Sequence, residues 1–226
     1  MAVITGKNGG ETLIGGSSND TINGGTGNDR ILSGDGADLI DGGDGNDQIN
    51  GYPTTGSAYS FWTYSGAKTI NGGNGDDFIY GADGADSISG GDGNDTVYGS
   101  LGNDSIEGSL GDDFLSGGSG NDSISGGSGN DSLYGGDGSD YVEGGDGDDY
   151  FSSQSGGNDT LLGGSGNDDL NAYTGTGNKY IDGESGNDKL YGGSGNDSLI
   201  GGTGEDTING SSGNDSVAGG IGNDNL

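Results

Sequence analysis

The chain has 226 residues, of which 60 are Gly, 37 are acidic and only five are basic, so its formal charge at pH 7 is −32. This charge excludes nucleic acid as a partner and argues against anionic membrane surfaces, because phosphate repels such a chain. Cys and His are absent, which excludes disulfides, thiolate metal sites, zinc triads and serine–histidine catalysis. Cations are the natural partner.

A period of nine residues runs from Gly6 to Leu226, with about 23 units of the pattern G-G-x-G-N-D-x-U-x, where U is apolar. One apolar residue between two variable ones predicts a three-residue strand whose middle side chain points inward. The other six positions predict a turn rich in Gly, Asn and Asp. The inward residues are expected to be Leu13, Ile22, Ile31, Ile40, Ile49, Ile70, Ile79, Ile88, Val97, Ile106, Leu115, Ile124, Leu133, Val142, Phe151, Leu161, Leu170, Ile181, Leu190, Leu199, Ile208, Val217 and Leu226.

The expected fold is all-β, a parallel β-roll (β-solenoid) that forms a single domain over residues 1–226. Two units make one coil, and stacked coils form two parallel sheets in a rod on the order of 55 Å long.

In chain order, the first expected strand is Ala2–Thr5, and regular units follow it. Three units are longer than nine residues: Gly51–Asn71 with a loop insertion at about 52–66, Ser153–Leu162, and Ala172–Asp182. Counted from Gly6, all three are even-numbered, so they are expected on one edge of the roll. The last unit ends at Leu226, and neither end shows a polar cap, which predicts end-to-end association unless the chain is a fragment.

Aspartate recurs at the sixth position of nearly every unit, which predicts a column of carboxylates along each turn edge. Such columns need counter-ions, and carboxylates joined by carbonyls of glycine-rich turns form the all-oxygen ligand set that suits Ca²⁺. The sixth-position aspartates are Asp20, Asp29, Asp38, Asp47, Asp77, Asp86, Asp95, Asp104, Asp113, Asp122, Asp131, Asp140, Asp149, Asp159, Asp168, Asp188, Asp197, Asp206, Asp215 and Asp224.

The repeated nonapeptide, as in GGSGNDSLY at 126–134, resembles that of the RTX (repeats-in-toxin) proteins. The resemblance implies a parallel β-roll with Ca ions along both turn edges, each held between adjacent coils by these aspartates and backbone carbonyls. Roughly 17 ions are expected, which nearly balances the charge, and the roll is expected to fold as calcium binds.

The sixth position departs from Asp at Glu11, Lys68 and Lys179. Both lysines lie in lengthened units. An ammonium there can pair with neighbouring aspartates where an ion would otherwise sit, so these local sites are expected to be metal-free.

Outward strand positions differ between the two sheets. Odd units carry the apolar and aromatic residues Ile14, Leu32, Phe78, Tyr80, Tyr98, Phe114, Tyr134, Tyr150 and Tyr191, whereas even units carry mostly polar residues. This aromatic face is either a cross-strand ladder or a contact surface. The insertion adds Tyr59, Phe61, Trp62 and Tyr64, which are expected to form a protruding contact loop.

Three functions remain open. The first is a non-catalytic, extracellular or cell-surface calcium-binding structural protein that self-assembles into a filament or layer through its uncapped ends and its aromatic face or loop. The second is a calcium-triggered folding and secretion module from a larger RTX exoprotein (toxin, protease, lipase or epimerase). The third is a polysaccharide- or ice-binding module. No catalytic residue and no membrane span are expected, and export is expected to be leaderless, since Met1–Thr5 is too short for a signal peptide.

Overall fold

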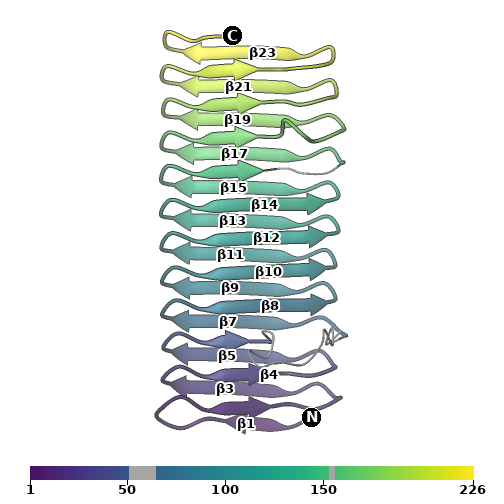
Figure 1. The fold of residues 1–226 in the computed structure, drawn as a ribbon, viewed down its shortest axis with the longest axis vertical. Coiled ribbons are helices and arrows are strands. Elements are labelled where there is room, and N and C mark those ends of the chain that lie inside the picture. Colours follow the sequence, from purple (N-terminus) through teal and green to yellow (C-terminus); the bar gives the residue numbers. More distant parts are fainter. Residues whose placement is uncertain (51–64, 153–155) are drawn as a thin grey trace, which may run out of the picture.

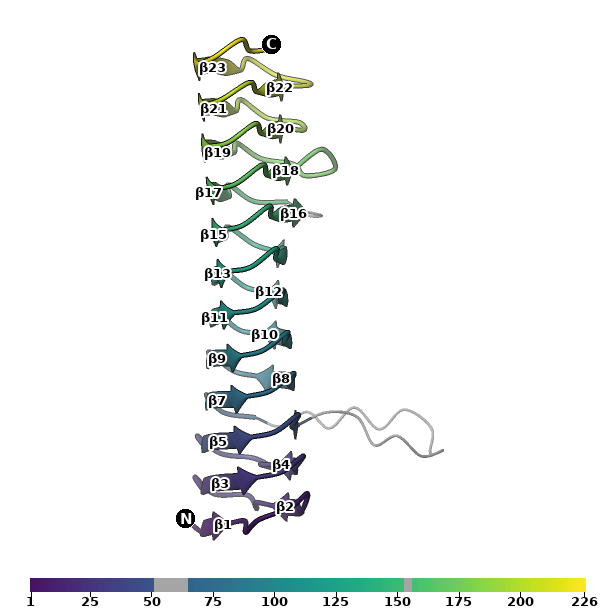
Figure 2. The same ribbon diagram turned by 90° about the vertical axis from the view of Figure 1, so that its left-hand side faces the viewer.

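The computed structural model describes residues 1–50, 65–152 and 156–226, and it shows a straight rod of stacked coils built from two parallel sheets (Figures 1 and 2). The predicted loop insertion at about 52–66, with its contact residues Tyr59, Phe61, Trp62 and Tyr64, lies almost entirely outside the described residues. Within the described residues no helix has the length and apolar character that crossing a membrane requires.

Odd-numbered strands form the 12-stranded sheet, in chain order. Its strands are β1 Val3–Thr5, β3 Thr21–Thr26, β5 Leu39–Asp44, β7 Thr69–Asn74, β9 Ser87–Asp92, β11 Ser105–Leu110, β13 Ser123–Ser128, β15 Tyr141–Asp146, β17 Thr160–Ser165, β19 Tyr180–Ser185, β21 Ser198–Thr203 and β23 Ser216–Ile221.

Even-numbered strands form the 11-stranded sheet. Its strands are β2 Thr12–Ile14, β4 Arg30–Leu32, β6 Gln48–Ile49, β8 Phe78–Asp83, β10 Thr96–Leu101, β12 Phe114–Ser119, β14 Ser132–Asp137, β16 Tyr150–Ser152, β18 Asp169–Asn171, β20 Lys189–Tyr191 and β22 Thr207–Asn209.

The coils stack with their units in register, so each unit pairs with the unit two further along. Ile106 of β11, for example, lies beside Ile88 of β9 and Ile124 of β13. This alternation of strands between two parallel sheets confirms the β-roll with two units per coil.

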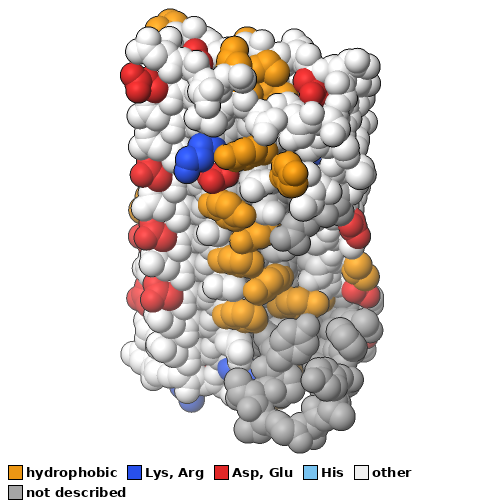
Figure 3. Space-filling view, turned by 45° about the horizontal axis from the view of Figure 1, so that its top comes forward, with side chains coloured by type: hydrophobic (Ala, Val, Ile, Leu, Met, Phe, Trp, Pro, Cys, Tyr) orange, Lys and Arg blue, Asp and Glu red, His pale blue; other side chains and the backbone are white. Residues whose placement is uncertain are grey.

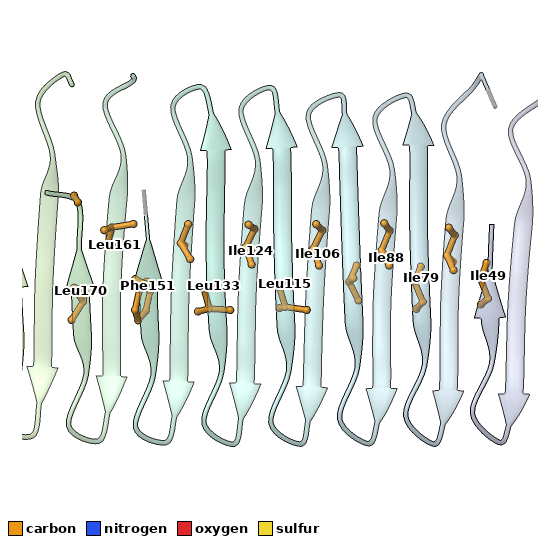
Figure 4. Packing of buried hydrophobic residues seen from close by; sticks show 14 of the residues in the cluster. Ile49, Ile79, Ile88, Ile106, Leu115, Ile124, Leu133, Phe151, Leu161 and Leu170 are labelled. Atoms are coloured by element: carbon orange, nitrogen blue, oxygen red, sulfur yellow. The ribbon is translucent and has the colours of Figure 1, made fainter. Parts of the chain in front are cut away.

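The core is two facing rows of single apolar side chains, one from each sheet (Figure 4). The eighth-position residues from Leu13 to Ile208 are at most 8% exposed, as the nine-residue pattern predicts. Val217 and Leu226 differ, with 38% and 69% exposure, because the described chain places no coil beyond them.

Many strands are longer than the three residues that the pattern predicts. β3, for instance, continues through Gly24, Gly25 and Thr26 of the next unit, because identical units in register keep their glycine backbones aligned for pairing. The second glycine of the unit requires a left-handed backbone, as at Gly25 with φ 103°. A few units place another residue there at a steric cost, as at Ser100 with φ 90°.

The two turn edges differ. Turns that lead from the 12-stranded to the 11-stranded sheet are uniform, and we call this side the continuous edge. The three lengthened units connect β6 to β7, β16 to β17 and β18 to β19, so they all lie on the opposite side, which we call the interrupted edge (right side of Figure 1). This confirms the expectation that they share one edge.

Candidate metal centre

The sixth-position aspartates are buried in the turns although they are charged groups. Those from Asp20 to Asp206 are at most 3% exposed, whereas Asp215 and Asp224 in the last coils are partly exposed. Charged side chains are rarely buried in this way unless they are paired or coordinate a metal.

One oxygen of each carboxylate joins two coils. Asp113 Oδ1 accepts the backbone N–H of Asp95 at 2.7 Å, and Asp131 Oδ1 accepts that of Asp113 at 2.8 Å. On the continuous edge this column of bonds starts at the N–H of Glu11 and extends to Asp224. Each turn is thereby tied to the turn above it through a carboxylate.

The other oxygen, Oδ2, is buried without a hydrogen-bond partner at most of these positions. In the described residues this holds for Asp29, Asp47, Asp77, Asp86, Asp95, Asp104, Asp113, Asp122, Asp131, Asp140, Asp149, Asp168, Asp188, Asp197 and Asp206. A single buried carboxylate oxygen without a partner is costly. A cation between the turns would stabilise a repeating series of such oxygens.

A backbone carbonyl from the next coil lies close to this free oxygen. At Gly163, the first residue of its unit, an added Cβ would lie 2.5 Å from Asp168 Oδ2 and 2.6 Å from the carbonyl oxygen of Gly183. The same pair of oxygens surrounds the first glycine of other units, among them Gly72, Gly117 and Gly201. Oxygens of adjacent coils therefore converge on a small space that only glycine leaves open.

Burial raises the pKa of these carboxyl groups. Desolvation, with a further contribution from neighbouring aspartates, raises the pKa to about 7 at Asp77, Asp86, Asp113, Asp131 and Asp168, and to about 6 at Asp47, Asp95, Asp140, Asp149 and Asp188. At Asp95 and Asp149 the neighbours that raise the pKa further are aspartates at other positions of the repeat, for example Asp92 beside Asp95. Asp20 differs, because hydrogen bonds from the backbone of Ala2 and Gly16 lower its pKa. A cation beside the raised groups would restore their ionised form.

The two sixth-position lysines show how these oxygens bind a cation. Lys68 Nζ is fully buried, lies 3.2 Å from Asp38 Oδ2, and donates to the carbonyls of Gly36 and Ser65 at 2.6 and 3.1 Å. An ammonium therefore occupies the space between two turns and is held by one carboxylate and two carbonyls.

Lys179 repeats this arrangement. Its Nζ lies 3.1 Å from Asp159 Oδ2 and donates to the carbonyls of Gly157 and Thr176 at 2.5 and 2.9 Å. In both cases the carbonyls belong to the fourth position of the lower turn and the third position of the upper turn. The sequence predicted the pairing with aspartates, but it carried no signal for which carbonyls take part.

These oxygens fit calcium. The described residues contain no group of three or more acidic side chains that could hold a metal. Beside the lysine ammonium groups, the oxygens of one carboxylate and two backbone carbonyls lie together. Carboxylate and carbonyl oxygens together are the hard donor set that Ca²⁺ takes, with six to eight of them around each ion. The residues present would hold it through Oδ2 and the carbonyls of the glycine-rich turns.

These features define a parallel β-roll whose turns are built to hold cations between coils. The family description of the RTX calcium-binding nonapeptide repeat (4 copies) matches residues 5–40, 26–52, 62–97, 89–124, 98–132, 116–151, 155–176, 171–199 and 191–226. The chain belongs to this family of calcium-binding repeats. A search of curated proteins found no match.

The aromatic face lies on the 11-stranded sheet, away from the turns. Ring centroids of Phe78, Tyr98, Phe114, Tyr134 and Tyr150 follow one another at 5.0 to 6.3 Å, and Figure 3 shows hydrophobic side chains in a strip with acidic groups on its flanks. The rings thus form a cross-strand ladder, which is one of the two alternatives that the sequence left open.

A surface hollow of about 520 Å³ adjoins the end of this ladder. It is lined by Tyr150, Ser152, Asn171, Tyr173, Thr174, Tyr191 and Asn209. Tyr173 and Thr174 come from the lengthened turn after β18, and no pattern in the sequence connects this turn with the aromatic face.

Proposed function

We propose that the protein is a non-catalytic, extracellular or cell-surface structural protein whose roll forms as Ca²⁺ binds along both turn edges. The observation that carries this proposal is the series of buried Oδ2 atoms facing carbonyls of the adjacent coil. The ligands are the twenty sixth-position aspartates, except that the Oδ2 atoms of Asp38 and Asp159 are paired with Lys68 and Lys179. Roughly 17 ions per chain follow if one ion fills each intact gap between turns.

An extracellular location suits these sites, because extracellular calcium modules bind their ions at roughly 0.1 to 1 mM. A calcium titration followed by far-UV circular dichroism tests the coupling of binding and folding. Sheet signal should appear cooperatively at millimolar calcium and disappear in chelator, whereas the same spectrum in both conditions would refute the coupling.

End-to-end association is the second part of the proposal. Among the described strands β1 pairs only with β3 and β23 only with β21, and apolar side chains lie open there, with Val3 and Ile221 each 75% exposed. Such complementary ends would stack into a filament or layer. Sedimentation in millimolar calcium should show oligomers that chelator dissolves. A monodisperse monomer would instead favour the alternative, a folding module of a larger RTX exoprotein whose other segments cover the ends.

A polysaccharide-binding function is favoured by the hollow beside the aromatic ladder. The seventh and ninth positions of the 11-stranded sheet carry just three charged residues among the described strands, Arg30, Asp169 and Lys189, and the last two lie 4.0 Å apart as an ion pair. This nearly neutral face of tyrosine rings and amides suits an uncharged polysaccharide. For ice binding the support is weaker, since the stacked Ser87, Ser105 and Ser123 end at Tyr141.

Binding to soluble neutral polysaccharides tests this function. Tyr173→Ala should weaken retention on a neutral glucan or mannan gel, because Tyr173 is 63% exposed in the hollow. Tyr180→Ala, on the opposite sheet and 40% exposed, is the control and should have no effect. Equal retention of both variants and the parent chain would refute the site, and sedimentation that depends on Tyr173 would assign the face to a second copy.

A further inference from the structure

Lys68 and Lys179 occupy equivalent places in the interrupted edge. Each is the sixth residue of a lengthened unit, and each is fully buried at its ammonium group. Their backbone N–H groups still join the carboxylate column, since Lys68 donates to Asp86 Oδ1 and Lys179 to Asp197 Oδ1 at 2.6 and 2.8 Å. The lysines are therefore integrated into the roll in the same way as the aspartates that they replace.

The number of contacts matches an ammonium and falls short of calcium. A lysine ammonium has three donors, and at both sites three oxygens surround it, one carboxylate Oδ2 and two carbonyls. Calcium takes six to eight oxygens. One ammonium therefore pairs with the aspartate of the lower turn and needs only three oxygens around it, which is fewer than a calcium ion needs. Both lysines lie in turns that are longer than the repeat.

Each lysine also changes the gap above it. Its side chain points down to the aspartate of the preceding coil, so its own turn offers no Oδ2 to the next gap. For Lys68 that next gap is the one closed by Asp86, and for Lys179 it is the one closed by Asp197. One lysine thus fills one cation position and removes a ligand from another.

We propose that Lys68 and Lys179 are covalently attached replacements for calcium, which keep the gaps at Asp38 and Asp159 closed without metal. This inference rests on the proposed calcium function. The interrupted edge then carries three separate runs of metal-holding gaps, which lie between the turns of Asp20 and Asp38, between the turns from Asp86 to Asp159, and between the turns of Asp197 and Asp215. The continuous edge carries a single run. The lysines also tie the lengthened turns to the coil below through the Ser65 and Thr176 carbonyls.

The test compares Lys179→Asp, Lys179→Met and the parent chain by equilibrium dialysis against calcium, with bound metal counted by mass spectrometry. Lys179→Asp restores the repeat and should bind about one or two more ions per chain. Lys179→Met should bind no additional ion. It should need more calcium to fold, because Asp159 loses its buried partner. The matched control is Lys189, which is 60% exposed and lies at 4.0 Å from Asp169, and its Asp and Met variants should bind as many ions as the parent chain.

An unchanged ion count in Lys179→Asp, or an additional ion in Lys179→Met, would refute the proposal that the lysine ammonium takes the place of a calcium ion. An unchanged calcium midpoint of folding in Lys179→Met would overturn the structural role of the ammonium. These results leave calcium binding by the parent chain intact. Absence of bound calcium in the parent chain would instead refute the proposed function and this inference with it.

Discussion

Replacing one aspartate of the continuous edge should remove the stability that calcium supplies at that position and leave the calcium-independent stability unchanged. Asp113→Asn keeps the Oδ1 acceptor for the Asp95 N–H, but it exchanges the partnerless Oδ2 for an amide that cannot bind a cation. A site with a dissociation constant of 0.1 to 1 mM contributes about 1.4 to 2.7 kcal/mol at 10 mM calcium. The variant should lose up to this amount for each ion that Asp113 binds.

Asp112→Asn is the matched control, because it removes the same charge from the same turn. Asp112 is exposed, and its Oδ1 accepts the Asn130 N–H at 2.8 Å, a bond that asparagine retains. Calcium titrations of folding by circular dichroism, with bound calcium counted in parallel, should shift to higher calcium in Asp113→Asn and stay in place in Asp112→Asn. Equal shifts in both variants, or no shift in either, would refute the assignment of Oδ2 as a calcium ligand.

Three further predictions concern pH, the core and the turns. Burial raises the pKa of Asp77, Asp131 and Asp168 to about 7 in the cation-free roll, so their protonation stabilises that form below the unfolded pKa near 4, and the effect is lost as the pH rises to about 7. Protons therefore compete with calcium for these oxygens in the folded roll, and the calcium concentration that half-fills its sites should rise as the pH falls from 8 to 5.5, whereas a constant half-saturation would contradict the shifts. Leu133→Ala, at a site 1% exposed, should cost about 2 to 5 kcal/mol in urea unfolding with saturating calcium, while Leu39→Ala at 52% exposure should cost under about 0.5 kcal/mol. Ser100→Gly should stabilise by about 1 kcal/mol, because it relieves a φ of 90°, and a thermal melt that shows destabilisation would argue against strain there.

Much of the fold follows from the spacing of a few residue types. One apolar residue per unit predicted the strands and the core from Leu13 to Ile208, and the parity of the lengthened units predicted that they share an edge. The length of the strands could not be read in the same way, because pairing through Gly24 and Gly25 depends on the register of neighbouring coils.

The site could be predicted in part. Side-chain periodicity located the aspartate columns and the exceptional lysines, since both are visible as letters in the sixth position. The carbonyls of Gly36 and Ser65 could not be found in this way, because every residue has a carbonyl and only the stacked turns show which ones point at the ammonium. The hollow at Tyr173 depends likewise on the path of one lengthened turn.

The most direct test of the account is a crystal structure grown in calcium, with anomalous diffraction used to locate the ions. The account predicts ions between successive turns along the whole continuous edge and in three runs on the interrupted edge, with none beside Lys68 or Lys179. Turns without ions, or an ion in place of either ammonium, would contradict it.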